Sequence, residues 1–296
     1  MEEVVTQHPL FYDNRTDEQK KENKKPVEAT CISLGESGVD LRILMWTENV
    51  VDNNKACSDC RIKILDRFEE EGIDTSYIFS DSKNPSGVAL ITVDAHAENC
   101  IVVASGANAN LLPTDLAKAE EAIEQAELIL MQLEIPMETV EFVAKTAWKK
   151  NKRVILNPAP AQTLSATLLR HLYMITPNET EAEMISGVKI TDEVSAEKAA
   201  RVIMEMGVQN VIITLGSKGA LIYCDSMVDM VPAIKVEAVD TTAAGDIFNG
   251  ALTVALAEGR DLREAVRFAC KASAISVTRV GAQSSAPYRN EVDIFD

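Results

Sequence analysis

The segment VDTTAAGDIFNG at 239–250 places small residues and a carboxylate directly before an apolar stretch. A helix predicted over 244–257 would begin at the small residues 243–245, whose backbone amides could then converge on an anion. Asp246 would lie in the first turn of this helix. A carboxylate there would repel a bound phosphate unless it accepts a proton from an attacking hydroxyl, as in phosphoryl transfer. The simpler alternative is that Asp246 only complements the helix dipole.

A second polar cluster, TPNETEAE at 176–183, directly follows a predicted strand that ends at Ile175. Pro177 and Asn178 are typical of a turn, and alternating glutamates then begin a predicted helix. These glutamates either cap the helix and complement its dipole, or form an acidic shell for hydrated Mg²⁺, which contacts carboxylates through its own waters. The residues themselves leave both interpretations open.

A third segment, TLGSKG at 214–219, is a glycine-containing turn between two predicted strands. A hairpin accounts for such a turn without any ligand. The segment also lacks the Gly-Lys-Ser/Thr ending of a Walker phosphate loop. Taken alone, it is only weak support for nucleotide binding.

The elements that must position these clusters alternate in type from Gly87 onward. Short β-rich runs alternate with helical patterns, which predicts an α/β fold with a mainly parallel, three-layer sheet and helices on both faces. The predicted strands are 87–93, 100–104, 128–133, 154–156, a run ending at 175, and 211–214, and the predicted helices are 113–126, a stretch up to about 149, 244–257 and 262–277. The carboxyl ends of parallel strands are the natural ligand-binding face.

The first 76 residues have a different pattern. Two alternating strand-like runs and one helical pattern are predicted there, at 27–33, 39–47 and 53–71. This is a small β-β-α segment and not the opening of a doubly wound sheet. We therefore expect an atypical α+β segment at 1–76 and a separate α/β domain at 77–296.

Composition excludes some classes of function. The 296 residues carry 46 acidic and 29 basic side chains, for a net charge of −17, which argues against a nucleic-acid partner. The chain shows neither a membrane span nor a signal peptide, so we expect a cytoplasmic protein. The six cysteines do not suggest a disulfide framework, and the pair Cys57 and Cys60 lacks the further ligands of a zinc site.

The three clusters, in this order and spacing, resemble the ribokinase family of carbohydrate kinases. The likeness covers about 77–296 and includes SGVALITVD at 86–94, ASGAN at 104–108, QLEIP at 132–136, LNPAP at 156–160 and VGAQ at 280–283. It implies a ribokinase-like fold and ATP-dependent phosphorylation of the ribose 5-hydroxyl. Phosphorylation of another sugar or of a nucleoside is the alternative.

The resemblance also implies roles for individual residues. Asp246 matches the general base, and the amides of Ala243, Ala244 and Gly245 match the anion hole. Glu134 and Asp246 match sugar-contacting positions. The nucleotide-binding positions match Asn178, Thr214, Leu215, Gly216, Ser217, Lys218, Gly219, Gly245 and Cys270.

Two cations are implied by the same resemblance. Glu181 matches a carboxylate that acts on Mg²⁺ through water. An activating K⁺ is implied at a loop that binds it largely through backbone oxygens. The residues matching that loop are Asp240, Thr242, Ser276, Arg279, Gly281 and Ser285.

The chain departs from the family at its start. The family opens with an Asn-x-Asp sugar grip and a Gly-Gly-Lys-Gly-Ala-Asn loop, whereas no two of the 13 glycines here are adjacent. Residues 8–72 instead resemble the cytoplasmic domain that ends small mechanosensitive channels. We therefore expect a hybrid chain without the sugar loop, without part of the lid and with unpaired sheet edges unless the new segment covers them. A nucleotide-binding protein without turnover is one alternative, and the family's lid pairing leaves a homodimer open.

Overall fold

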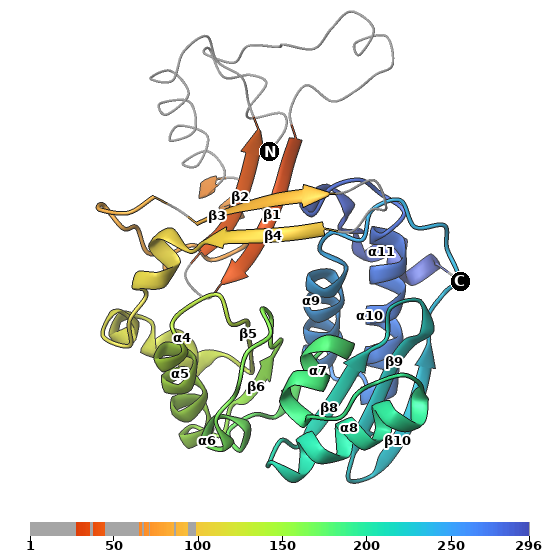
Figure 1. Ribbon diagram of the computed structural model, residues 1–296. Coiled ribbons are helices and arrows are strands. Elements are labelled where there is room, and N and C mark those ends of the chain that lie inside the picture. The colour runs from red at the N-terminus through yellow and green to blue at the C-terminus, as the bar shows by residue number, and fades with distance from the viewer. Residues whose placement is uncertain are drawn as a thin grey trace, which may run out of the picture.

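The computed structural model describes residues 28–35, 38–44, 65–66, 68–70, 72–85, 87–93 and 99–295. Six strands form one sheet in the order β10-β9-β8-β7-β6-β5 (Figure 1). They are β5 (Leu128–Met131), β6 (Arg153–Leu156), β7 (Met174–Ile175), β8 (Asn210–Thr214), β9 (Gly219–Cys224) and β10 (Met227–Pro232). Strands β5 to β8 are parallel, and β9 and β10 continue the sheet as an antiparallel extension.

Helices cover both faces of this sheet, which confirms the predicted three-layer α/β arrangement. One face carries α4 (Glu120–Gln125), α5 (Met137–Lys149), α6 (Ala166–Leu169), α7 (Glu179–Ser186) and α8 (Glu193–Glu205). The other face carries α9 (Ala244–Ala257), α10 (Leu262–Ser276) and α11 (Arg289–Ile294). None of the described helices is long and apolar enough to cross a membrane.

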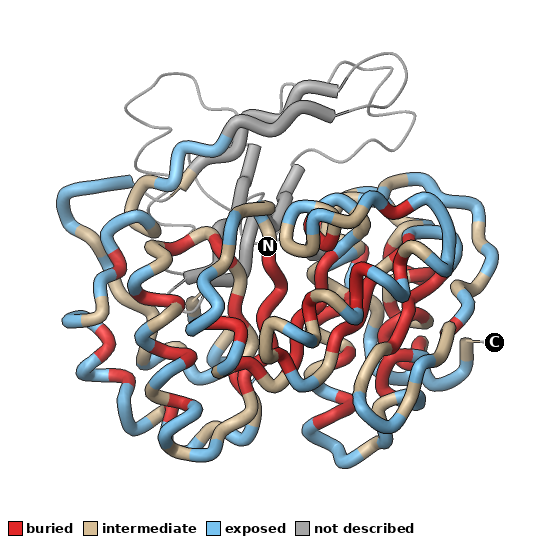
Figure 2. The backbone as a smooth tube through the Cα atoms, turned by 60° about the horizontal axis from the view of Figure 1, so that its bottom comes forward, coloured by how far each residue is buried: buried red, intermediate tan, exposed pale blue. Residues whose placement is uncertain are grey.

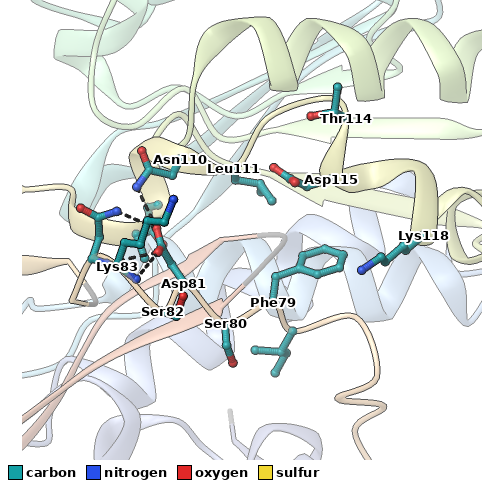
Figure 3. A pocket seen from close by; sticks show the side chains of 14 residues that line it. Phe79, Ser80, Asp81, Ser82, Lys83, Asn110, Leu111, Thr114, Asp115 and Lys118 are labelled. Carbon is teal, nitrogen blue, oxygen red and sulfur yellow. Dashed lines mark hydrogen bonds between the residues drawn. The ribbon is translucent and has the colours of Figure 1, made fainter.

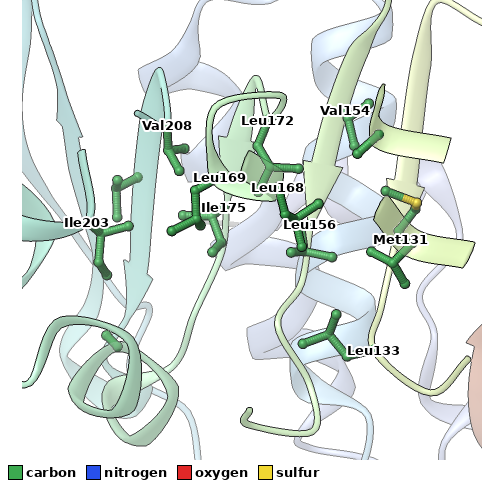
Figure 4. Packing of buried hydrophobic residues seen from close by; sticks show 14 of the residues in the cluster. Met131, Leu133, Val154, Leu156, Leu168, Leu169, Leu172, Ile175, Ile203 and Val208 are labelled. Atoms are coloured by element: carbon green, nitrogen blue, oxygen red, sulfur yellow. The ribbon is translucent and has the colours of Figure 1, made fainter. Parts of the chain in front are cut away.

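Alternating side chains of each strand enter two separate hydrophobic cores. In β6, Val154 and Leu156 join the core under α5 and α8, while Ile155 joins the core under α9 and α10. Figure 4 shows the first of these cores, in which Leu156 lies among the leucines of 168–172. Buried residues run through the middle of the body and exposed ones along its outside (Figure 2). Burial on both faces explains why the strands read as continuous apolar runs.

Two antiparallel hairpins stand apart from the main sheet. They pair β1 (Glu28–Gly35) with β2 (Gly38–Leu44) and β3 (Val88–Val93) with β4 (Asn99–Ala104). Strand β1 contacts the 3₁₀ turn η4 (Gln283–Ser285), so the N-terminal hairpin lies against the C-terminal part of the chain. No described strand pairs with the outer edge of β5.

The predicted helices at 113–126 and 53–71 can each be compared with the structure. The predicted helix at 113–126 is interrupted: a 3₁₀ turn, η2 (Asp115–Lys118), precedes α4, and Ala119 between them has φ −100° and ψ 3°. Asp115 accepts a hydrogen bond from the Leu112 amide at 2.9 Å and begins the tighter turn. Of the predicted helix at 53–71, residues 65–66 and 68–70 are helical, and all the others lie outside the described residues.

Candidate functional site

Polar side chains follow the parallel strands at one end of the sheet. Gln132, Asn157 and Thr176 come immediately after the last residues of β5, β6 and β7. Asn157 and Thr176 are buried, and Gln132 is partly buried. Because β5, β6 and β7 are parallel neighbours, these three residues lie side by side at their carboxyl ends.

The start of α9 meets the same end of the sheet. Its N-cap residue, Ala243, has φ +60°, a left-handed conformation that is unfavourable for a residue with a Cβ atom. The Ala244 amide donates to the Thr241 carbonyl at 3.2 Å, and Ser273 of α10 donates to the Ala244 carbonyl at 3.1 Å. Among the described residues, the amides of Ala243 and Gly245 have no backbone partner. Strain and free amides at a helix start are features of an anion site.

Asp246 lies in the first turn of α9, as predicted, and its carboxylate faces β5. Gln132 Nε2 donates to Asp246 Oδ1 at 2.8 Å, across 114 positions of sequence. Burial raises the pKa of the Asp246 carboxyl above its ordinary value, and the Gln132 hydrogen bond opposes that rise. A carboxylate with a raised pKa beside free amides is suited to accept a proton next to a bound anion.

Behind Asp246, a buried hydrogen-bond chain connects the strand ends to α9. The Thr176 hydroxyl donates to Asn249 Oδ1 at 2.6 Å, and Asn249 Nδ2 donates to the Gly245 carbonyl at 2.9 Å. Asn157 Nδ2 approaches the Thr176 carbonyl at 3.4 Å. Reasoning from sequence missed Gln132, Asn157, Thr176 and Asn249 as site residues. The available signal was that the first three each follow an apolar strand directly.

The structure brings Asn178 together with the turn at 214–219. Asn178 and Thr214 form a parallel β-bridge, and the Thr214 amide donates to the Pro177 carbonyl at 2.9 Å. The predicted hairpin joins β8 to β9 through a 3₁₀ turn, η3 (Gly216–Lys218). Lys218 Nζ lies 3.6 Å from Glu179 Oε1 at the start of α7. Cys270, also predicted to bind nucleotide, is placed in the core between α10 and the sheet, and burial raises the pKa of its thiol to about 11.

Glu181 and Asn178 form a reciprocal cap at the start of α7. Asn178 Oδ1 accepts from the Glu181 amide, and Glu181 Oε2 accepts from the Asn178 amide, both at 2.8 Å. Glu181 is nevertheless only 6% exposed, and burial raises its pKa to about 7. The capping interpretation is therefore correct as geometry, yet capping by itself does not require a buried carboxylate.

The segments around Asp240 and Gly281 are joined by one carboxylate. Asp240 Oδ1 accepts from the Thr242 amide at 2.9 Å, and Asp240 Oδ2 accepts from the Gly281 amide at 2.8 Å. Burial raises the pKa of the Asp240 carboxyl, but these hydrogen bonds outweigh it and leave the pKa below its usual value. The Asp240 amide also donates to Val277, one residue beyond Ser276. Thus Asp240, Thr242, Ser276 and Gly281 come together.

The other two residues of the predicted potassium loop have local partners. Arg279 forms an ion pair with Glu291 at 2.5 Å. The buried Ser285 donates its hydroxyl to the Ala282 carbonyl at 2.6 Å. Within the described part of the chain, no group of three or more His, Cys, Asp or Glu side chains converges to hold a metal ion.

Glu134 and one cavity lie outside the contacts described above. Glu134 lies two residues after Gln132, in the loop that leaves β5. A cavity of about 750 Å³ opens between residues 78–84 and 107–118 (Figure 3). Asp81 lines it and accepts hydrogen bonds from the Lys83 amide, Asn84 and Asn110, which lower its pKa to about 2. The lining includes none of the predicted site residues.

Comparison with known proteins places these features in a family context. The family model for pfkB family carbohydrate kinases matches residues 62–289. The chain is 48% identical to a ribokinase of Haemophilus influenzae over 224 residues, which is 76% of this chain and 73% of that protein. It is 40% identical to a ribokinase of Staphylococcus aureus, covering 78% and 76% of the two chains. A solved ribokinase structure from Thermotoga maritima is similar with a TM-score of 0.70 and 33% identity, over 90% of this chain and 94% of that one.

Proposed function

Because the chain belongs to the pfkB family of carbohydrate kinases, we propose that it transfers a phosphoryl group from ATP to a sugar hydroxyl, with the 5-hydroxyl of ribose as the first candidate. The observation that carries this proposal is the place of Asp246, whose carboxylate lies at the start of α9 beside free backbone amides. A base next to an anion site is what attack of a hydroxyl on a phosphate requires.

In this mechanism Asp246 accepts the proton of the attacking hydroxyl. Its raised pKa supports that role because a base is most effective when its pKa is close to the working pH. We assign the stabilisation of the transferring phosphoryl group to the amides of Ala243 and Gly245. The Ala244 amide, which donates to Thr241, shapes the turn.

We place the nucleotide along Asn178 and the turn at 214–219. Their junction through the Thr214 bridge, and the side chain of Lys218 beside α7, support this placement. Cys270 lies in the hydrophobic core, so we propose that it contributes to the nucleotide site through packing. Glu134 is proposed to contact the sugar because its loop leaves β5 next to Gln132.

The residues present also fit Mg²⁺. The buried Glu181 has one oxygen held by the Asn178 amide and a pKa near 7, so a nearby dication would stabilise its ionised form. Mg²⁺ bound there through water would neutralise charge on the ATP phosphates.

We further propose that K⁺ occupies the loop held together by Asp240. The Asp240 carboxylate already accepts hydrogen bonds from the amides of Thr242 and Gly281. The ligands that the loop offers to K⁺ would therefore be backbone oxygens. Such oxygens suit a hard monovalent cation. The cation would hold the segment that precedes α9 against the segment that follows α10.

The organisation of the whole chain is part of the proposal. We propose a kinase domain at 77–296 and an added segment at 1–76, with the resemblance of 8–72 to a channel domain kept as a prediction. We also propose a cytoplasmic location and pairing into a homodimer. The contact between β1 and η4 supports a hairpin that lies against the kinase domain.

The test is ADP release by the purified full chain with ATP, Mg²⁺ and K⁺. A panel of ribose, 2-deoxyribose, hexoses and nucleosides identifies the acceptor. We expect ribose to give the highest kcat/KM, and replacement of K⁺ by a larger organic cation to lower the rate. ADP release that no acceptor accelerates would contradict the proposal.

A nucleotide-binding role without turnover is the second candidate, and the missing Gly-Gly sugar loop is the observation that favours it. Calorimetry separates the two functions. ATP-analogue binding accompanied by ribose binding supports the kinase, whereas ATP-analogue binding with no heat from ribose supports the second candidate.

A further inference from the structure

The side-chain amide of Gln132 has an unusual set of partners. Its Nε2 donates to Asp246 Oδ1 at 2.8 Å and lies 3.4 Å from Asn157 Oδ1. Its Oε1 is buried and has no hydrogen-bond partner, and among the described residues it is the one buried side-chain polar atom in that position. Buried polar atoms are rarely left unpaired in folded proteins, so this one needs an explanation.

The explanation is the charge of Asp246. If the amide rotated by half a turn, its carbonyl oxygen would face the Asp246 carboxylate, and two acceptors would then repel each other. The Asn157 oxygen is an acceptor as well and favours the same orientation. Serving these two acceptors therefore leaves Oε1 without a donor. A side chain chosen for packing alone would not contain this unpaired atom.

The partners of Gln132 lead back to the helix that carries Asp246. From Asn157 the contacts continue to the Thr176 carbonyl at 3.4 Å, and the Thr176 hydroxyl donates to Asn249 at 2.6 Å. Asn249 then donates to the Gly245 carbonyl at 2.9 Å. The contacts form a closed circuit that includes both the carboxylate of Asp246 and the turn that precedes it. Buried hydrogen bonds that link several elements in this way restrict the relative movement of the groups they join.

We propose that Gln132 is a positioning residue, which orients the Asp246 carboxylate and, through the buried circuit, fixes it relative to the Gly245 turn. The inference rests on the proposed function, in which Asp246 is the base. It assigns Gln132 to the chemical step and not to the binding of nucleotide, because Asn178 and Thr214 have their own separate contacts. A base that is misplaced by a fraction of an ångström loses rate without losing affinity.

The ionisation of Asp246 gives this role a specific readout. The two influences on its pKa are burial, which raises it, and the Gln132 hydrogen bond, which lowers it. Other ionisable side chains lie on the surrounding segments, and none of them contributes to the shift. They are Glu134 after β5, Glu181 in α7, Asp240 before α9, and Arg267, Cys270 and Lys271 on α10, which packs against α9. Removing the Gln132 amide should therefore raise the pKa of Asp246 further.

The experiment compares Gln132→Leu, Gln132→Glu and the control Gln162→Leu. Gln162 is a partly buried amide at the same end of the sheet, and it donates to the Leu133 carbonyl at 3.2 Å and not to a carboxylate. For Gln132→Leu we expect kcat to fall roughly tenfold, the KM for ATP to stay within about twofold, and the acidic limb of kcat/KM to move up by roughly one pH unit. Gln132→Glu should move that limb further, because two adjacent carboxylates resist ionising together. Gln162→Leu should leave the limb in place.

A second readout does not depend on turnover. The carboxyl ¹³C shift of Asp246, assigned by its loss in Asp246→Asn, is titrated in the unaltered chain and in each variant. If no protein turns over, the proposed function fails, but the titration still decides the role of Gln132. An Asp246 titration that is the same in the unaltered chain and in both Gln132 variants overturns the inference. Gln132→Glu keeps the test available if Gln132→Leu does not fold.

Discussion

The Thr176 hydroxyl donates to Asn249 Oδ1 over 2.6 Å and so joins the end of β7 to the second turn of α9. Thr176 is 1% exposed and Asn249 is 4% exposed, so water cannot replace this contact. Because Asn249 in turn holds the Gly245 carbonyl, the position of the free amides at the start of α9 depends on a side chain of the sheet. This single hydrogen bond connects folding stability to the geometry of the site.

Replacing Thr176 by Val should therefore affect stability and activity together. The change keeps the shape of the side chain but leaves Asn249 Oδ1 buried without a donor, which should lower the free energy of unfolding by about 1–3 kcal/mol. Urea denaturation measures the loss. The matched control is Thr253→Val in α9, whose hydroxyl bonds the Asn249 carbonyl at 2.8 Å. Its loss should cost less than about 0.5 kcal/mol, and equal losses in the two variants would refute the special role of Thr176.

The buried Glu181 predicts an unusual dependence of stability on pH. Its pKa is about 7 in the folded chain against 4.5 in the unfolded one, so the folded chain keeps this proton in the interval between them. The stabilising contribution is therefore complete below about pH 4.5 and is lost as the pH rises through 7. After allowance for solvent screening the loss should be roughly 2 kcal/mol.

Glu181→Gln tests that prediction in a buffer without Mg²⁺. Glutamine keeps a carbonyl oxygen for the Asn178 amide and has no charge to bury, so the variant should lose the decline in stability between pH 5 and 8. Glu193→Gln, at an exposed position in the first turn of α8, is the control and should retain the decline. If Glu181→Gln has the same pH slope as the unaltered chain, the buried charge is not its source.

The left-handed conformation of Ala243 predicts opposite effects on stability for glycine substitutions at Ala243 and Ala244. Ala243→Gly removes a conformational cost of about 1–2 kcal/mol, partly offset by the greater freedom of glycine in the unfolded chain, so stability should rise by up to about 1 kcal/mol. Ala244→Gly, at the first helical residue, should instead lower stability by about 0.5–1 kcal/mol. Thermal unfolding of both variants is the measurement. Destabilisation by both would show that φ +60° is not the conformation of Ala243 in solution.

Strong local signals made much of the fold predictable from sequence. The helical period of apolar residues and the small residues at its start predicted the bounds of α9, Ala244–Ala257. The strands could be predicted because burial on both faces makes them continuous apolar runs. Helix α8 was missed although Asp192 and Ser195 form a capping box at its start. Its inward side is mostly alanine, which carries a weak hydrophobic signal.

The candidate site was predictable only where its residues are close in sequence. Asp246 and its turn form one continuous motif, whereas Gln132 lies 114 positions away and meets Asp246 only through the order of the strands. Asn157 and Asn249 are buried polar residues whose role depends on partners from other elements. A single sequence does not contain those distances, so the supporting circuit required a structure.

The most direct test of the whole account is the rate of sugar phosphate formation in a single turnover, measured by mass spectrometry for the unaltered chain and for Asp246→Asn. Asp192→Asn serves as the control, because asparagine can still cap α8 and the residue is exposed. We predict that Asp246→Asn slows the reaction by about 10²- to 10⁴-fold with ATP still bound, while Asp192→Asn keeps the rate of the unaltered chain. A rate for Asp246→Asn within about tenfold of the unaltered chain would contradict the assignment of Asp246 as the base.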